Sequence, residues 1–371
     1  NKVGDFYRYD PAGDSWQTLA LWKGGIENKG PAKGSVGVAD GHGRVYAVKG
    51  NNTLGFWCYF SDGDSWHQLP DVPLGITRKK VKGGSDLVYL EENGLPYVYL
   101  LKGYKNEFFR FNIAADSWER LAEAPEGVYP KWDKGSWLVY DGLRYIYAHK
   151  AKVHEFWRFD CWSASWDTHQ LKGMPFLSRT GKTKRSKDGS SGAWNEGFIY
   201  ALKGGNTCEF YKYDVAGDSW TELDTMPSVG STGKKKRVKA GGDLVAAGPG
   251  LFYALKGNKT REFWYYYEPK VDAPLWWDNG GVAALASSTR WLALAPNPAK
   301  ERVQLEFGTA VTQSARVRVY DISGALVIER RFAGGELGTR SLELKGLAEG
   351  VYLVRMEGSG LAAVQKLVIQ R

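Results

Sequence analysis

An aromatic motif recurs along this chain. Six times, a pair of aromatic residues is followed about ten residues later by a Trp. The copies are DFYRYDPAGDSW at Asp5, GFWCYFSDGDSW at Gly55, EFFRFNIAADSW at Glu107, EFWRFDCWSASW at Glu155, EFYKYDVAGDSW at Glu209 and EFWYYYEPKVDAPLWW at Glu262. From Phe56 onward the spacing is 52, 48, 54 and 53 residues. A repeated unit can bury its apolar face only against its neighbours, so the repeat determines the architecture.

Each unit contains four predicted strands. A glycine-rich apolar strand comes first, and a second apolar strand ends in Lys-Gly, as in VYLLKG at Val98 and IYALKG at Ile199. The aromatic strand and the strand that begins with Trp complete the unit. This spacing predicts an all-β propeller with one four-stranded blade per unit.

The two ends of the repeat region are expected to close the ring together. The chain begins with a third and a fourth strand, at 5–19, that lack a first and a second. The segment GGVAALASSTRWLALAP at Gly280 aligns with GGDLVAAGPGLFYALKG at Gly241 and supplies the missing pair. The prediction is therefore a propeller over 1–295, most simply with six blades, whose last blade takes its inner strands from 280–295. Five or seven blades are the alternatives.

The repeat resembles kelch-repeat propellers. The resemblance rests on the closing Trp and on two further features. These are the glycine pairs at Gly83, Gly241 and Gly280, and the second-strand tyrosines Tyr46, Tyr99, Tyr147, Tyr200 and Tyr253. Two units have Gly-Ser instead, at Gly34 and Gly135. Kelch-like rings mostly bind partners through their loops, and the fold alone does not name the partner.

Lysine recurs in register at two positions. One set ends the second strand: Lys49, Lys102, Lys150, Lys203 and Lys256. The other precedes the first strand: Lys33, Lys82, Lys134, Lys187 and Lys239. Three connections without acids, TRKKVK at Thr77, KTKRSK at Lys182 and KKKRVK at Lys234, add Lys80, Lys184, Arg185, Lys236 and Arg237. Both positions lie at one end of an antiparallel meander, so this face should concentrate the net charge of +9.

Two interpretations of these lysines remain open. They form a docking face for a polyanion, such as an acidic polysaccharide or lipopolysaccharide. Nucleic acid is the weakest candidate because the loops show no evident stacking platforms. Alternatively, they keep the loops soluble and pair with the strand-end acids Glu107, Glu155, Glu209 and Glu262.

The sixteen tryptophans divide into two groups. The closing residues Trp16, Trp66, Trp118, Trp166, Trp220 and Trp276 are expected to pack between blades. Trp132, Trp137, Trp162 and Trp194 break the pattern and are candidates for exposed sugar platforms.

Catalysis finds little support in the sequence. The five histidines have no metal-ligand spacing, and Gly181-Lys182-Thr183 lacks the rest of a phosphate loop. Nothing singles out a His, Tyr and Cys set for a copper-radical oxidase. We therefore expect no enzyme, no metal and no cofactor. Of the three cysteines, Cys58, Cys161 and Cys208, two sit in aromatic strands as small buried thiols, and no apolar run is long enough to span a bilayer.

The chain after Trp291 contains no Trp, which marks a second domain at 296–371. Pro296-Asn297-Pro298 is interpreted as the linker. Alternating segments predict a small Ig-like β-sandwich: RVQLEF at Arg302, ARVRVYDI at Ala315, LVIERRF at Leu326, RSLELKGL at Arg340, VYLVRM at Val351 and VQKLVIQR at Val364. Val317 and Val319 should face one way and Arg316 and Arg318 the other.

This tail resembles the C-terminal sorting domain of the type nine secretion system. The matching segments are Pro296 to Pro298, Val319 to Gly324, Leu347 to Val354 and Lys366 to Ile369. The resemblance implies contact with the secretion machinery and export across the outer membrane of a Bacteroidetes-like bacterium to its surface or surroundings. The domain is often removed after export in that family, whereas here the sequence includes it.

Two functions follow. The first is a non-enzymatic surface protein that binds a glycan, an envelope polyanion or a protein through the lysine face. The second is a structural subunit that self-assembles through the propeller and the retained tail into an extracellular filament or layer, because head-to-tail contacts build open filaments.

Overall fold

The computed structural model describes residues 3–11, 13–25, 28–92, 94–231, 233–268, 292–307, 314–321, 326–333, 338–358 and 361–370. Within these residues the chain is all β, without a helix, and no helix could therefore cross a membrane. It divides into two compact units, one formed by Asn1–Ala247 with Phe252–Tyr266 and one that contains the C-terminal strands.

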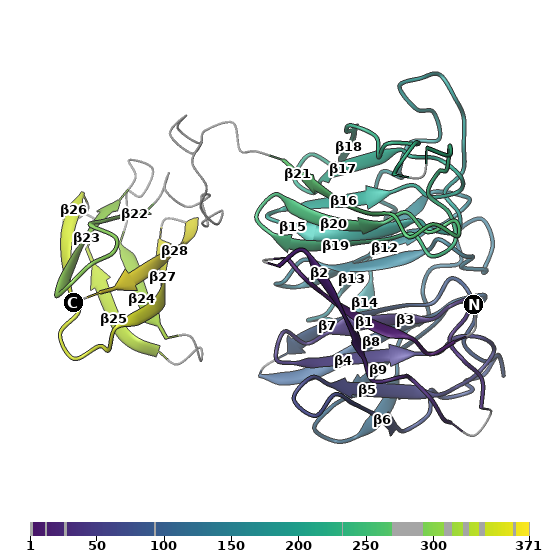
Figure 1. The fold of residues 1–371 in the computed structure, drawn as a ribbon, viewed down its shortest axis with the longest axis horizontal. Coiled ribbons are helices and arrows are strands. Elements are labelled where there is room, and N and C mark those ends of the chain that lie inside the picture. Colours follow the sequence, from purple (N-terminus) through teal and green to yellow (C-terminus); the bar gives the residue numbers. More distant parts are fainter. Residues whose placement is uncertain are drawn as a thin grey trace. The chain divides into compact units, whose positions relative to one another are not determined.

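The first unit is a β-propeller whose antiparallel sheets follow one another in chain order (Figure 1). Each sheet is called a blade. The first blade contains β3 (Val36–Ala39), β4 (Arg44–Val48), β5 (Phe56–Phe60) and β6 (Ser65–Leu69), and the second β7 (Asp86–Glu92), β8 (Leu95–Lys102), β9 (Glu107–Asn112) and β10 (Ser117–Arg120). The third contains β11 (Trp137–Tyr140), β12 (Tyr145–Lys150), β13 (Glu155–Asp160) and β14 (Ser165–Trp166).

The fourth blade contains β15 (Ser191–Asn195), β16 (Phe198–Leu202), β17 (Phe210–Asp214) and β18 (Ser219–Glu222). The fifth contains the three described strands β19 (Asp243–Gly248), β20 (Leu251–Leu255) and β21 (Phe263–Tyr267). The predicted order of strands is confirmed in the first four blades and for the three described strands of the fifth. The assignment to kelch repeats in particular stays a prediction.

The apolar core of the propeller lies between neighbouring blades. One cluster joins Val48 and Phe56 of the first blade to Leu87 and Leu100 of the second, and similar clusters lie at the next three junctions. The first strands β3, β7, β11 and β15 contact one another in that order, which places them around the ring's interior. Each blade therefore buries its faces against its neighbours, as a repeat requires.

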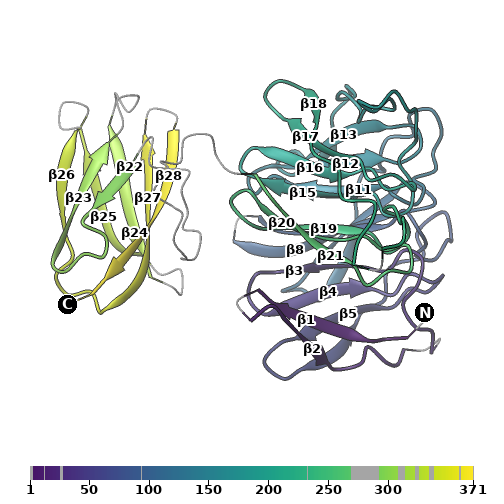
Figure 2. The ribbon, with the colours of Figure 1, turned by 45° about the horizontal axis from the view of Figure 1, so that its top comes forward.

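The N-terminal hairpin of β1 (Phe6–Asp10) and β2 (Ser15–Leu19) joins the two ends of the ring (Figure 2). Phe6 packs against Tyr59 of the first blade, with ring centroids 4.8 Å apart. Tyr9 packs against Phe263 of the fifth blade at 4.8 Å. The inner strands expected for this sheet at 280–291 lie outside the described residues. The last part of that expectation was wrong, because Leu292–Ala295 belongs to the tail as β22.

The tail is a sandwich of two sheets. One is β22 (Leu292–Ala295), β23 (Arg302–Phe307) and β26 (Thr339–Glu343). The other is β25 (Leu326–Phe332), β24 (Ala315–Tyr320), β27 (Gly350–Gly358) and β28 (Leu361–Ile369). The shared core contains Leu305 from the first sheet and Val317, Val319 and Leu367 from the second.

The alternation predicted for Val317 and Val319 is therefore confirmed. Pro296 to Pro298 forms the turn between β22 and β23 inside this sandwich, so it is not an interdomain linker. Leu292–Ala295, which the prediction gave to the propeller, belongs to the second domain, because β22 pairs with β23 and Leu292 is buried in the tail core.

Candidate functional site

The lysines that end the second strands are inside the protein. Lys49 is 3% exposed, and Lys102, Lys150, Lys203 and Lys256 are 0% exposed. The expectation that these five residues belong to a docking face was therefore wrong. Four of them pair with the strand-end acids, as the alternative interpretation held: Lys102 with Glu107, Lys150 with Glu155, Lys203 with Glu209 and Lys256 with Glu262. We call these four the paired lysines.

The connection that follows β6 covers the pair in the second blade. The Lys102 Nζ lies 2.8 Å from Glu107 Oε2 and donates to the carbonyls of Pro73 (3.0 Å) and Leu74 (2.7 Å). The Thr77 N–H and hydroxyl donate to the Glu107 carboxylate. Each paired lysine likewise contacts its glutamate, and those of the third and fourth blades also donate to loop carbonyls. The pairs therefore fix the loops of this face to the strands beneath.

Burial and the ion pairs shift the pKa values of these groups. Desolvation lowers the pKa of Lys102 and of Lys150, and the paired glutamates partly offset it. Burial alone would raise the pKa of Glu107, but the hydrogen bonds from Lys102 and Thr77 outweigh it and hold that pKa below its usual range. The pairs are internal structure rather than binding groups.

The second lysine set stays accessible. Lys33, Lys187 and Lys239 are exposed, and Lys82 and Lys134 are half-buried. We call these five the connection lysines. The turn after the second strand hydrogen-bonds to the connection that follows its blade, as from Asn52 N to Val81 O (3.0 Å) and from Asn206 N to Val238 O (2.9 Å). Both positions therefore lie at one end of the ring, as predicted.

The connection lysines follow one another around this end. A Cβ on Gly34, which comes directly after Lys33, would overlap the Lys82 carbonyl of the next blade. The same overlap joins Gly83 to the Lys134 side chain, Gly135 to the Lys187 carbonyl and Gly189 to the Lys239 carbonyl. Only glycine fits this approach, and Gly34, Gly135 and Gly189 have positive φ as well. The repeat thus sets the five lysines side by side in blade order.

The basic connections extend this surface outward. Lys184 and Arg185 are exposed, and Lys80, Lys236 and Arg237 are half-buried. Lys82 Nζ lies 4.9 Å from the Tyr104 ring centroid, and Lys131 Nζ approaches the same ring at 4.6 Å. The acid Asp133 is already engaged by Lys131 and Lys152. The accessible charge at this end is therefore mainly positive.

Two of the four candidate platforms are core residues. Trp132 is 0% exposed and donates from Nε1 to the Pro125 carbonyl (3.2 Å). Trp137 is 2% exposed and donates to the Ser190 hydroxyl (3.1 Å). The expectation of exposed platforms was wrong for both, because the connection and the first strand that carry them lie between blades.

The other two candidates differ from each other. Trp194 is half-buried and stacks on Tyr147 at 6.3 Å between ring centroids. Trp162 is 69% exposed, with the Arg144 guanidinium 4.5 Å above its ring. Only Trp162 of the four presents an open ring face.

The closing tryptophans connect neighbouring blades, as predicted. Each donates from Nε1 to a backbone carbonyl of the preceding unit: Trp66 to Ala20 (3.2 Å), Trp118 to Pro70 (2.9 Å), Trp166 to Ala122 (3.1 Å) and Trp220 to Lys172 (2.7 Å). Trp16 packs on Phe263. Trp276 lies outside the described residues.

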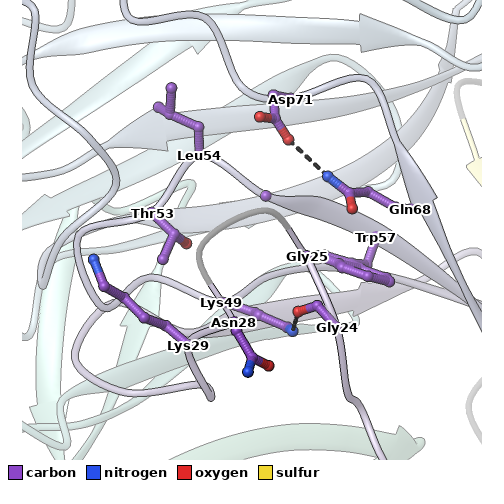
Figure 3. A pocket seen from close by; sticks show the side chains of 11 residues that line it. Gly24, Gly25, Asn28, Lys29, Lys49, Thr53, Leu54, Trp57, Gln68 and Asp71 are labelled. Atoms are coloured by element: carbon purple, nitrogen blue, oxygen red, sulfur yellow. Dashed lines mark hydrogen bonds between the residues drawn. The ribbon is translucent and has the colours of Figure 1, made fainter.

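The first blade departs from the lysine and glutamate pattern. Gly55 occupies the position of the paired glutamates, and a cavity of about 80 Å³ lies beside it (Figure 3). Its lining residues are Gly24, Gly25, Asn28, Lys29, Lys49, Thr53, Leu54, Gly55, Trp57, Gln68 and Asp71. Sequence reasoning missed this site, although the signal was present in the motif that begins with Gly55 where later copies begin with Glu. We call it the first-blade cavity.

Two inner carboxylates were also missed. Asp86 begins β7 and accepts the N–H groups of Leu87 (2.9 Å) and of Leu138 in the next blade (2.7 Å). Burial raises the pKa of Asp86 to about 7, and nearby Asp243, at the start of β19, adds to the shift. Both residues are the first residue of a first strand, and this recurrence of Asp is the sequence feature that could have identified them.

The buried histidines are structural groups. His154 bonds through Nδ1 to the Met174 carbonyl (2.6 Å) and accepts the Ser186 N–H at Nε2 (2.7 Å). Desolvation lowers the pKa of His154 to about 4 and that of His149 well below its usual value. Among the described residues, no three His, Cys, Asp or Glu side chains gather as metal ligands. Cys58 and Cys161 are buried, and Cys58, Cys161 and Cys208 are all free thiols.

Solved structures with a similar fold exist at low sequence identity. An auxiliary nutrient binding protein from Bacteroides thetaiotaomicron aligns with a TM-score of 0.45 and 12% identity, over 68% of this chain and 63% of that one. This chain thus spans less than two thirds of that protein. A protein from Lactobacillus plantarum aligns with a TM-score of 0.38 and 13% identity, over 91% of this chain and 94% of its own. With TM-scores this low, neither similarity indicates what this chain binds.

The tail has a family match. No curated protein sequence matches the chain. Residues 293–370, however, match the family described as secretion system C-terminal sorting domain, which agrees with the sandwich and with the motifs in its strands. Residues 293–370 are therefore a C-terminal sorting domain of the type nine secretion system, which indicates export to the cell surface or the extracellular space.

Proposed function

We propose that this exported propeller is a non-enzymatic binding protein that holds an acidic glycan on the face formed by the connection lysines. The observation that carries the proposal is the close approach of four connection lysines, Lys82, Lys134, Lys187 and Lys239, to a glycine of the preceding blade. This arrangement sets like charges side by side, which costs free energy unless an anionic partner neutralises them.

The binding surface is narrower than the sequence indicated. The paired lysines are buried in ion pairs with their glutamates. The anion would therefore contact the connection lysines and the exposed Lys184 and Arg185. A flexible polysaccharide with regularly spaced carboxylates suits a surface whose charges recur once per blade. Exposed Trp162 adds an aromatic ring elsewhere on the propeller.

Binding of polygalacturonate, with neutral dextran as the comparison, tests the proposal. We expect binding at low salt that weakens steeply as salt rises, because exposed charges are screened. The double variant K187M/K239M should lose most of this affinity. The matched control K345M removes one exposed lysine from the sorting domain and should bind as the wild type does. Either of two results would contradict the proposal: the wild type binds polygalacturonate equally well at low and at high salt, or K187M/K239M binds it as tightly as the wild type does.

Assembly into filaments is the alternative function. Electron microscopy of the same purified chain separates the two, because a binding protein gives separate particles at all salt concentrations and a filament subunit gives ordered polymers.

A further inference from the structure

The fifth blade shows how a propeller blade of this chain holds a carboxylate. Glu262 begins the aromatic strand and pairs with Lys256. The Trp264 Nε1 donates to the same carboxylate oxygen at 3.2 Å. One ammonium and one indole N–H therefore converge on one carboxylate.

The first blade has the same two donors without the acid. Lys49 and Trp57 occupy the positions of Lys256 and Trp264, and Gly55 occupies that of Glu262. A Cβ on Gly55 would lie 2.9 Å from Trp57 Nε1, so the indole occupies part of the space that the side chain of an acid would need and would have to shift to admit it. Comparison with the fifth blade thus indicates that the space beside Gly55 accepts a carboxylate.

Both donors are buried and incompletely satisfied. Trp57 is 6% exposed, and its Nε1 has no hydrogen-bond partner among the described residues. The Lys49 Nζ carries three protons and donates to the Gly24 carbonyl at 2.6 Å. It also lies 4.6 Å from the Trp57 ring centroid. Buried donors favour an acceptor strongly, and a buried ammonium favours an anionic one.

Further side chains that line the first-blade cavity offer groups for hydroxyls. Gln68 Nε2 donates to Asp71 Oδ1 at 3.1 Å, and both side chains line the cavity with Asn28 (Figure 3). The Asp71 carboxylate would repel a second anionic group, which disfavours phosphate and sulfate. An amide both donates and accepts and a carboxylate accepts, so the two together can hydrogen-bond vicinal sugar hydroxyls.

We infer that the first-blade cavity binds the carboxylate of a hexuronic acid residue, which takes the place that a glutamate side chain fills in the fifth blade. The Lys49 ammonium and the Trp57 N–H hold the carboxylate, and Gln68 and Asp71 receive the hydroxyls. A cavity of about 80 Å³ admits the carboxylate and part of one ring. The inference rests on the proposed function only in its ligand class, because the cavity uses none of the connection lysines.

Isothermal titration with D-glucuronate, and with D-glucose as its neutral counterpart, tests this inference on the full chain. We expect D-glucuronate to bind at a single site and D-glucose not to bind. The variant G55E restores the acid of the other blades, so it should abolish D-glucuronate binding, with the Trp57 indole shifting to admit the new side chain. Glu262 with Trp264 shows that an acid and an indole at these two positions can contact each other.

Further variants separate the contributions. K49M keeps the apolar stem and should lose binding, and W57F, which removes only the N–H and part of the ring, should weaken it at least several-fold. K187M/K239M should bind D-glucuronate as the wild type does even if its affinity for polygalacturonate is lost, which separates this inference from the proposed function. E27Q removes the acid that stands between Gly25 and Asn28 in the sequence, at a position outside the described residues, and should leave D-glucuronate binding unchanged.

Four outcomes would overturn the inference. They are no D-glucuronate binding at millimolar concentrations, equal binding of D-glucose, undiminished binding by G55E, or binding that is gained only in E27Q. The last would mean that a carboxylate of the chain itself, and not a ligand, is the anion that Lys49 accepts.

Discussion

At the scale of single residues, the paired lysines show how a charge becomes part of a core. A buried ammonium is stable only with its anion and its hydrogen bonds in place, and Lys102 has Glu107 and two carbonyls. Lys49 has one carbonyl and two indole rings instead. The same substitution at these two positions should therefore have different effects.

K102M should lower the free energy of unfolding by about 3 to 5 kcal/mol, because Glu107 would remain buried without its cation. K49M should cost about 1 kcal/mol or less, since among the described residues it leaves no buried acid without its cation and loses mainly the contact of the ammonium with the indole rings. Urea unfolding followed by Trp fluorescence measures both, and it reports on the propeller region because no Trp lies after Trp291. Equal losses in the two variants would refute this account of the pairs.

At the scale of the element, the turn between the third and fourth strands explains the recurrent Asp-Ser-Trp. The residue before Ser has positive φ in each turn: Asp14, Asp64, Asp116, Ala164 and Asp218. Asp64 accepts the Ala20 N–H, and Asp218 accepts the Lys172 N–H, both at 2.8 Å. Aspartate suits this position because it tolerates the left-handed region and joins the blade to its predecessor.

Ala164 is the exception, with φ of 50° and no side-chain acceptor. Ala122 stands in the preceding blade where Ala20 and Lys172 stand, since its carbonyl receives Trp166 Nε1. A164D should therefore raise the free energy of unfolding by about 1 kcal/mol, through relieved backbone strain and one new hydrogen bond. A164G should give the smaller gain of strain relief alone. Denaturant unfolding of the three proteins checks the order, and a less stable A164D would contradict it.

The strands could be predicted from the sequence, but which side chains the connecting loops bury could not. Alternation and repeat spacing reveal strand order because each blade must present the same apolar positions to its neighbours. Whether Lys102 faces water depends on the path of the connection above it, to which residues 73–77 contribute atoms that no local pattern reveals. The useful signal was the glutamate in register with each lysine, together with its loss at Gly55. The prediction for Trp132 and Trp137 failed for the same reason, because a Trp outside the repeat pattern can still be buried in the core.

At the scale of the whole molecule, closure of the ring depends on the N-terminal hairpin. Phe6 contacts the first blade, while Tyr9 and Trp16 contact the fifth. These contacts cover the edges that an open ring would expose. The sorting domain is a separate unit with its own core.

The double variant Y9A/W16A should lower the free energy of unfolding of the propeller by about 2 kcal/mol, because several aromatic contacts with Tyr253 and Phe263 are lost. The control Y7A removes an exposed ring of the same strand and should change little. The Trp fluorescence assay described above compares them. If Y7A costs as much as the double variant, the hairpin does not act through closure.

The N-terminal hairpin also sets an order of events in folding. Each blade forms from contacts between residues close in sequence, so one blade can form without the others. Tyr9, however, contacts Tyr253 and Phe263, which come from the far end of the repeat region. These contacts require nearly the whole propeller, so the hairpin is the last element to dock, and closing the ring is expected to be the slow step of folding.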